Sequence, residues 1–179
     1  MVVQLGEQLA AMGWRRLVLF NAHGGQIALL QVAARELRQR CPAMAVLPCF
    51  LWSGVDGLVD LLPKDELENG LHAGLAETSL MLHLASELVG EQRPVDGLPG
   101  LEGTPCPPSG WSLEGAAPSA WLMEDLSRSG VIGDSSTASA ELGKALEQRL
   151  MLHWTKRLRA LLVSDWPAPA EPVDRTSAS

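Results

Sequence analysis

The chain has 179 residues, of which 46% are apolar and 20% charged, and its net charge is -7. This length supports one ordinary domain around one core, which excludes a disordered chain and a small disulfide scaffold. The acidic charge is spread along the chain, so we expect no nucleic-acid partner. Three cysteines and the absence of a long uncharged apolar stretch predict a cytoplasmic protein with neither a signal peptide nor a membrane span.

The pattern of the first fifty residues predicts a helix, a strand, a helix and a strand. Helical apolar spacing covers 2–12 and 27–37, and a short unbroken apolar run at 17–20 predicts a strand buried on both faces. A second strand is expected at 44–50. A βαβ unit of this kind predicts an α/β fold with a mostly parallel sheet flanked by helices.

The remainder of the chain is expected to be helical around one irregular stretch. An apolar, core-facing helix is predicted over 75–89, and a long helix over 142–161. Glycine and proline are so dense in 90–118 that we expect a mobile surface excursion without regular structure. We expect one α/β domain over 1–163 and a flexible tail over 164–179.

The first candidate site is the turn Asn21-Ala22-His23-Gly24-Gly25-Gln26. It follows the first predicted strand, and open α/β sheets bind ligands at the carboxyl ends of their strands. The paired glycines allow a sharp turn and the close approach of another group, while His23 can extend over the sheet edge. A tight turn with a histidine but no function explains the same letters equally well.

The second candidate is His72-Ala73-Gly74-Leu75-Ala76-Glu77-Thr78-Ser79. On one continuous helix, His72 and Glu77 would lie about 140° apart and could not share a ligand. They can converge only if His72 precedes the helix and Glu77 lies in its first turns. Otherwise Glu77 stabilises the helix start and His72 is a loop residue.

Taken together, these motifs resemble those of the creatininase family, the creatinine amidohydrolase-like metal-dependent hydrolases. The family patterns N-G-H-G-G-N and H-A-G-x-x-E-T-S are similar to the two segments above. A third pattern, G-V-x-G-D-P, is similar to Gly130-Val131-Ile132-Gly133-Asp134, which is followed by Ala138 and Gly143. Three motifs in the same order span about residues 14 to 162.

The resemblance implies a creatininase-like fold and a divalent metal site at the carboxyl edge of the sheet. His23 and Glu77 would be metal ligands, and His72 either the catalytic acid or base or the group that polarises the carbonyl. The residues implied to support the site are Asn21, Gly24, Gly25 and Gly74. Zinc, manganese and iron all suit histidine and carboxylate ligands. A complete family member is expected to hold two metal ions and to form a homo-oligomer.

The chain also departs from the family pattern. Members carry an upstream segment E-x-H-G-x-H-L-P-x-x-T-D that supplies further ligands, and the residues before His23 contain neither histidine nor aspartate. We therefore expect the first βαβ region to be missing, an unpaired sheet edge, and weak metal binding by this chain alone. Gly25 replaces an acidic residue of the creatinine-hydrolysing members, which disfavours creatinine as the substrate.

The leading hypothesis is a metal-dependent hydrolase that cleaves a C–N bond in a small, possibly cyclic, amide. Such an ion lowers the pKa of a bound water and polarises the amide carbonyl. The alternative is a non-catalytic truncated α/β remnant or interaction subunit.

Overall fold

The computed structural model describes residues 1–101, 103–104 and 107–167. The described residues fall into two compact units, one made of Met1–Gly54 with the described residues from Trp154 on, and the other of Val55–His153. The single domain over 1–163 remains a prediction. Most of the predicted tail, 168–179, lies outside the described residues; within 164–167, Arg16 donates hydrogen bonds to the carbonyls of Ser164 and Trp166.

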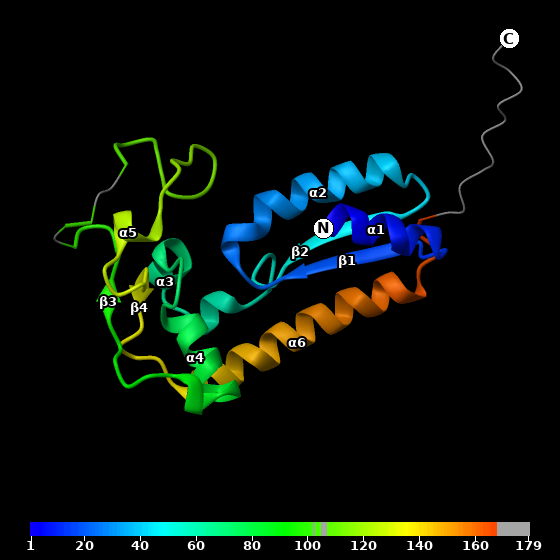
Figure 1. Ribbon diagram of the computed structural model, residues 1–179. Helices are drawn as coiled ribbons and strands as arrows, with labels where there is room; N and C mark the ends of the chain where they lie inside the picture. The colour runs from blue at the N-terminus through cyan, green and yellow to red at the C-terminus, as the bar shows by residue number, and fades with distance from the viewer. Residues whose placement is uncertain (102, 105–106, 168–179) are drawn as a thin grey trace, which may run out of the picture. The chain divides into compact units, whose positions relative to one another are not determined.

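The first unit confirms the predicted βαβ order (Figure 1). Its elements are α1 (Val2–Ala11), β1 (Arg16–Asn21), the 3-10 turn η1 (Gly24–Gln26), α2 (Ile27–Arg40) and β2 (Ala45–Phe50). β1 and β2 pair in parallel, with Arg16 opposite Ala45 and Asn21 opposite Phe50. Parallel pairing requires the crossover that α2 provides.

The core of the first unit lies where α2 meets α1 and β2. Leu37 and Met44 are almost fully buried there. On α1, Gly6 lies so close to α2 that an added Cβ would be 2.1 Å from Leu37 Cδ2. Glycine at this position therefore allows the two helices to approach each other closely.

β1 is not buried on both faces, contrary to the prediction. Its Phe20 side chain is 48% exposed. The Phe20 ring meets Trp154 edge-on, with ring centroids 4.8 Å apart, and the Trp154 indole N–H donates to the Leu51 carbonyl over 2.8 Å. One aromatic neighbour covers only part of a phenylalanine side chain, so an unbroken apolar run does not by itself establish burial on two faces.

The second unit contains short elements joined by loops. They are η2 (Leu58–Asp60), α3 (Lys64–Asn69), α4 (Leu75–Leu84), η3 (Ser86–Leu88), β3 (Val95–Asp96), α5 (Met123–Leu126), β4 (Gly133–Asp134) and the first part of α6 (Ala140–Val163). The predicted long carboxyl-terminal helix is thus confirmed. Ile132 and Leu146 are completely buried in this unit.

The helix predicted over 75–89 is shorter than expected. α4 ends at Leu84, because Ala85 adopts φ -156° and ψ 63°, and a separate 3-10 turn follows. Leu84 and Leu88, which were expected to face the core, are exposed. Buried positions lie instead in the first turns of α4, at Leu75, Ala76 and Ser79.

The glycine- and proline-rich stretch 90–118 contains a regular element, which the composition did not predict. β3 pairs antiparallel with β4, Val95 opposite Asp134 and Asp96 opposite Gly133. Gly97 continues this contact with φ +66°, and an added Cβ would be 3.0 Å from Ile132 Cα. Here glycine permits a left-handed backbone and a close approach between segments, so its presence does not indicate an irregular chain.

Candidate functional site

The turn that carries His23 lies at the carboxyl end of β1, as predicted. The buried Asn21 side chain donates from Nδ2 to the His23 carbonyl over 2.7 Å, and its Oδ1 accepts the His23 backbone N–H over 3.1 Å. These two bonds hold the His23 backbone directly after the strand. The His23 side chain itself is exposed at this edge.

The two glycines of this turn act differently from the expectation. Neither Gly24 nor Gly25 has a positive φ, so the turn does not need the conformational freedom of glycine. At Gly25, however, an added Cβ would be 3.1 Å from His23 Nε2, whereas no atom lies within 4 Å of one at Gly24. Gly25 therefore gives the imidazole room to lie over the turn.

A cavity of about 210 Å³ opens beside this turn within the first unit. It is lined by the ends of both strands, the start of α2 and one residue of α6, including Asn21, Phe50, Ile27 and Trp154. Cys49 also lines this cavity, and burial raises the pKa of its thiol. The cavity is at the sheet edge where α/β proteins bind ligands.

The second motif meets the geometric condition set by its sequence. His72 precedes α4, where it forms an antiparallel bridge with the buried Ile132, and Glu77 lies in the first turn of α4. The Ile132 N–H donates to the His72 carbonyl over 2.8 Å, and the His72 N–H donates back over 3.1 Å. The third motif therefore holds the backbone of the second in place.

Ala73 links His72 to Glu77 through an unusual backbone conformation. Its φ is +51°, a left-handed value that a residue with a side chain rarely adopts. Glu77 Oε2 accepts the Ala73 N–H over 2.7 Å, and the Thr78 hydroxyl donates to the Ala73 carbonyl over 2.9 Å. Backbone strain of this kind persists only where its surroundings enforce it, and it is concentrated at functional sites.

Glu66 also belongs to this cluster, and the sequence reasoning missed it. Its Oε1 accepts the Ala76 N–H over 2.8 Å at the start of α4. Burial raises the pKa of Glu66, and the charges of Glu77 and Asp134 raise it further, while backbone N–H groups of Ala76 and Leu75 oppose the shift. Glu66 and Ala76 are ten residues apart, and no motif or periodic spacing in the sequence indicates a contact between them.

The predicted site residues are divided between the two units. Asn21, His23, Gly24 and Gly25 belong to the first, and His72, Gly74 and Glu77 to the second. The convergence of His23 with Glu77 therefore stays a prediction. Within the residues that the structure describes, no three histidine, cysteine or acidic side chains gather as a metal-binding group.

No helix of this described part has the length and apolarity to cross a membrane.

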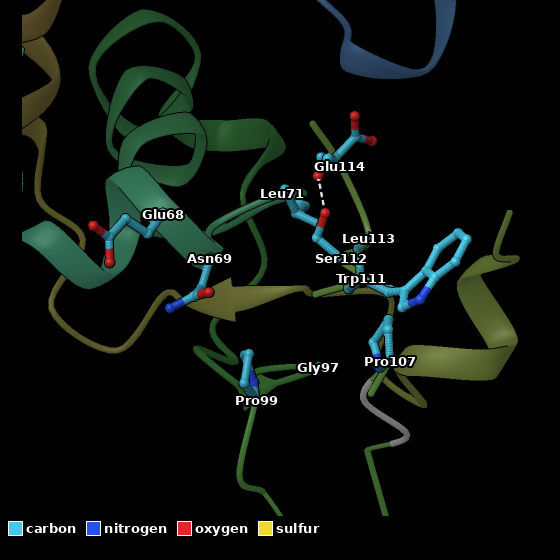
Figure 2. Close-up of a pocket in the computed structure, with 10 residues that line it drawn as sticks. All are labelled: Glu68, Asn69, Leu71, Gly97, Pro99, Pro107, Trp111, Ser112, Leu113 and Glu114. Carbon is cyan, nitrogen blue, oxygen red and sulfur yellow. Dashed lines mark hydrogen bonds between the residues drawn. The ribbon is translucent and has the colours of Figure 1, made fainter. Parts of the chain in front are cut away.

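A second cavity, of about 300 Å³, adjoins Leu71 in the second unit (Figure 2). Leu71, Pro99, Pro107 and Leu113 supply apolar walls. In Figure 2 the carboxylates that belong to this lining, on Glu68 and Glu114, point away from the other lining residues. Because Leu71 directly precedes His72, the cavity flanks the second motif.

Comparisons with known proteins agree with the motif pattern. The family model for creatinine amidohydrolase matches residues 1–158. The mycofactocin precursor peptide peptidase of Mycobacterium ulcerans (strain Agy99) is 30% identical over 139 residues, which make up 73% of this chain and 43% of that relative. The chain therefore spans less than half the length of the curated relative that it matches.

Solved structures show the same fold. A putative creatinine amidohydrolase from Bacteroides fragilis NCTC 9343 aligns with a TM-score of 0.73 at 20% identity, covering 91% of this chain and 60% of that one. A structure described as creatininase Mn aligns with a TM-score of 0.64 at 24% identity, covering 91% of this chain and 63% of that one. The mixed α/β architecture, with its parallel sheet and flanking helices, is shared with these proteins.

Proposed function

Because the chain belongs to the creatininase family, we propose that it contributes to a metal-dependent hydrolase that cleaves the C–N bond of an amide. One observation carries this proposal: Glu77 accepts the Ala73 N–H, which fixes its carboxylate next to the residue that follows His72. This carboxylate, anchored beside a strained backbone that directly follows a histidine, is suited to acid–base and ligand roles.

The side chains present are of the types that bind divalent metal ions. Imidazole and carboxylate ligands suit zinc, manganese and iron, and we propose His23 and Glu77 as the two ligands from this chain. The Glu77 Oε2 atom is engaged by Ala73, so Oε1 is the proposed ligand atom. The chemistry that a bound ion supplies is Lewis acidity toward the amide carbonyl.

His72 is the proposed catalytic acid. Its backbone is fixed on both sides by Ile132, so a limited set of side-chain rotamers determines where the imidazole reaches. Once a water has added to the amide carbonyl carbon and lost a proton, a protonated imidazole of His72 would give its proton to the amide nitrogen as the C–N bond breaks, so that a carboxylic acid and a neutral amine leave. An imidazole is suited to this step because its unperturbed pKa lies near neutrality.

The substrate is proposed as a class and not as a compound. The family model names creatinine, a cyclic amide, and the mycobacterial relative is described as a peptidase for a precursor peptide. The bond shared by the two is an amide C–N bond. Gly25, at the position where creatinine-hydrolysing members carry an acid, supports an amide other than creatinine.

The proposal extends to assembly and location. We propose that the protein is a homo-oligomer in the cytoplasm. The exposed apolar residues Leu29 and Val32, three residues apart on α2 and 70% and 64% exposed, support the assembly. Light scattering after size-exclusion chromatography measures the assembly. A Leu29→Glu/Val32→Glu variant should shift the chain toward the monomer; a wild-type chain that is already monomeric would contradict this part.

Hydrolysis of small amides and short peptides with added zinc or manganese tests the function. Glu77→Gln keeps the shape and removes the anionic ligand, so activity should fall by more than the roughly 10- to 100-fold that loss of a supporting partner costs, with little change in stability. Glu87→Gln, at an exposed glutamate that lines neither cavity, is the matched control. Unchanged hydrolysis in Glu77→Gln, or none in any metal-loaded form, would overturn the proposal and favour the non-catalytic alternative.

A further inference from the structure

The short helix α3 places a carboxylate at the start of α4. Glu66 Oε1 accepts the Ala76 N–H over 2.8 Å. The first N–H groups of a helix have no partner within the helix, and a side chain at the N-cap usually accepts one of them. The N-cap of α4 is Gly74, which has no side chain, so Glu66 provides the cap from another element.

Glycines from separate segments make room for this carboxylate. An added Cβ would be 2.5 Å from Glu66 Oε2 at Gly70 and 2.7 Å from it at Gly74. At Gly133, whose φ is +152°, an added Cβ would be 2.9 Å from the Gly74 Cα. Side chains at Gly70 and Gly133 would thus press on backbone atoms, Glu66 O at 2.7 Å and Gly74 Cα at 2.9 Å, and one at Gly74 would displace the Glu66 carboxylate. The three glycines leave the space that this carboxylate occupies, which indicates a specific placement.

This placement is costly if its only effect is to cap a helix. Without the Glu66 carboxylate in this space, a serine, threonine or asparagine at position 74 could supply the cap locally. Here a half-buried acid lies near the like charges of Glu77 and Asp134. Like charges and burial both disfavour an ionised carboxylate, so the arrangement needs a further explanation.

Two carboxylates hold adjacent parts of one turn. The Glu66 carboxylate accepts the N–H of Ala76. Glu77 directly follows Ala76, and its carboxylate accepts the N–H of Ala73. We propose that Glu66 is a positioning residue: by fixing the first turn of α4 it directs the Glu77 carboxylate to Ala73 and keeps His72 and Glu77 in register. The inference rests on the proposed function for its chemistry, but the positioning itself can be measured separately.

Three substitutions in the full chain separate positioning from folding. Glu66→Leu removes the acceptor, Glu66→Asp keeps the charge but shortens the side chain by one methylene, and Glu66→Gln keeps an oxygen acceptor of the same reach. Glu87→Leu, at an exposed glutamate of the same unit that lines neither cavity, is the matched control. If Glu66→Leu does not fold, the comparison of Glu66→Asp with Glu66→Gln gives the answer.

Amide exchange at Ala73 and Ala76 is the first measurement, and calorimetric zinc binding the second. In Glu66→Leu and Glu66→Asp, exchange at both amides should accelerate at least about tenfold relative to amides of α6, and zinc affinity should fall about 10- to 100-fold. Glu66→Gln should stay within about threefold of the wild type in both measurements.

The two measurements also distinguish the failure of each claim. Unchanged exchange at Ala73 in folded Glu66→Asp, or equal loss in Glu66→Gln and Glu66→Leu, would overturn the positioning role. A wild-type chain that binds no zinc, but whose Ala73 protection depends on Glu66, would overturn the proposed function and support the positioning.

Discussion

Asp96 shows how one side chain can fix the loop that leads to β4. Its Oδ2 accepts hydrogen bonds from the Ser127 and Ser129 hydroxyls and from the backbone N–H groups of Arg128 and Ser129, over 2.8 to 3.0 Å. The Ser129 N–H and the two hydroxyls hold the pKa of Asp96 well below its usual range, because they bind its charged form. The carboxylate therefore stabilises the fold only when it is ionised.

The sign of the resulting pH dependence follows from this shift. The folded-state pKa is depressed, so the stabilisation is present above the unfolded pKa of about 3.9 and is lost as the pH falls through the folded value. Asp96→Asn should lower the midpoint of urea unfolding at pH 7, and the difference from the wild type should shrink below pH about 4. Glu91→Gln, an exposed acid of the same stretch, is the control. A deficit that is equal at both pH values would contradict this assignment.

At the residue scale, the sequence predicted the motifs but not their support. His72, Glu77 and the break between them could be anticipated, since the two residues can share a ligand only if His72 precedes the helix. Glu66 could not, because its role depends on Gly70, Gly74 and Gly133 coming together around it. Contacts of this kind follow from tertiary packing and leave no periodic signal.

At the element scale, α6 packs against α4 through Gly143. An added Cβ there would be 1.9 Å from the Ser79 carbonyl oxygen, a backbone atom that cannot move aside alone. Gly143→Ala would gain about 1 kcal/mol of helix propensity but lose about 1–3 kcal/mol or more to overpacking. We expect a lower midpoint of thermal unfolding by several degrees.

Gly90→Ala is the matched control for this prediction. No atom lies within 4 Å of an added Cβ at Gly90, and its φ is not positive, so its stability should stay within about 0.5 kcal/mol of the wild type. Equal unfolding midpoints for Gly143→Ala and the wild type would show that the contact between α4 and α6 is looser than described.

The stretch 90–118 is predicted to remain the most mobile internal segment despite β3. Its loops around 107–118 make few backbone hydrogen bonds, such as that from the Ser112 N–H to the Ala117 carbonyl, whereas β1 is paired along its length. Amides of 107–118 should exchange at least roughly tenfold faster than those of 17–20. Equal protection would indicate that this loop is packed against another surface.

Element boundaries were predictable where two signals coincided. β1, α2 and β2 have both an apolar pattern and a flanking turn, and their observed bounds agree with the prediction. The end of α4 was missed because the apolar letters continue to Leu88 while the backbone changes direction at Ala85. Apolar residues report burial only on average, and Leu84 and Leu88 are exposed.

For the whole molecule, the central proposal is that His23 and Glu77 bind the same metal ion. His23 is held at the end of β1 in the first unit, and Glu77 at the start of α4 in the second. The fold and the separate motifs could be predicted from the sequence. The convergence of His23 with Glu77 remains a prediction, since it depends on how α/β layers bring distant segments together.

Calorimetric titration of the purified chain with zinc or manganese tests this claim most directly. His23→Ala and Glu77→Gln should each weaken the same binding event more than about tenfold, and the double variant should lose little further affinity, because residues that share one site are not additive. Gln26→Ala, in the same turn as His23, should bind like the wild type. Two outcomes would contradict the account. One is that the two substitutions weaken separate binding events and that their losses of metal affinity add in the double variant. The other is that either single variant binds the metal with wild-type affinity.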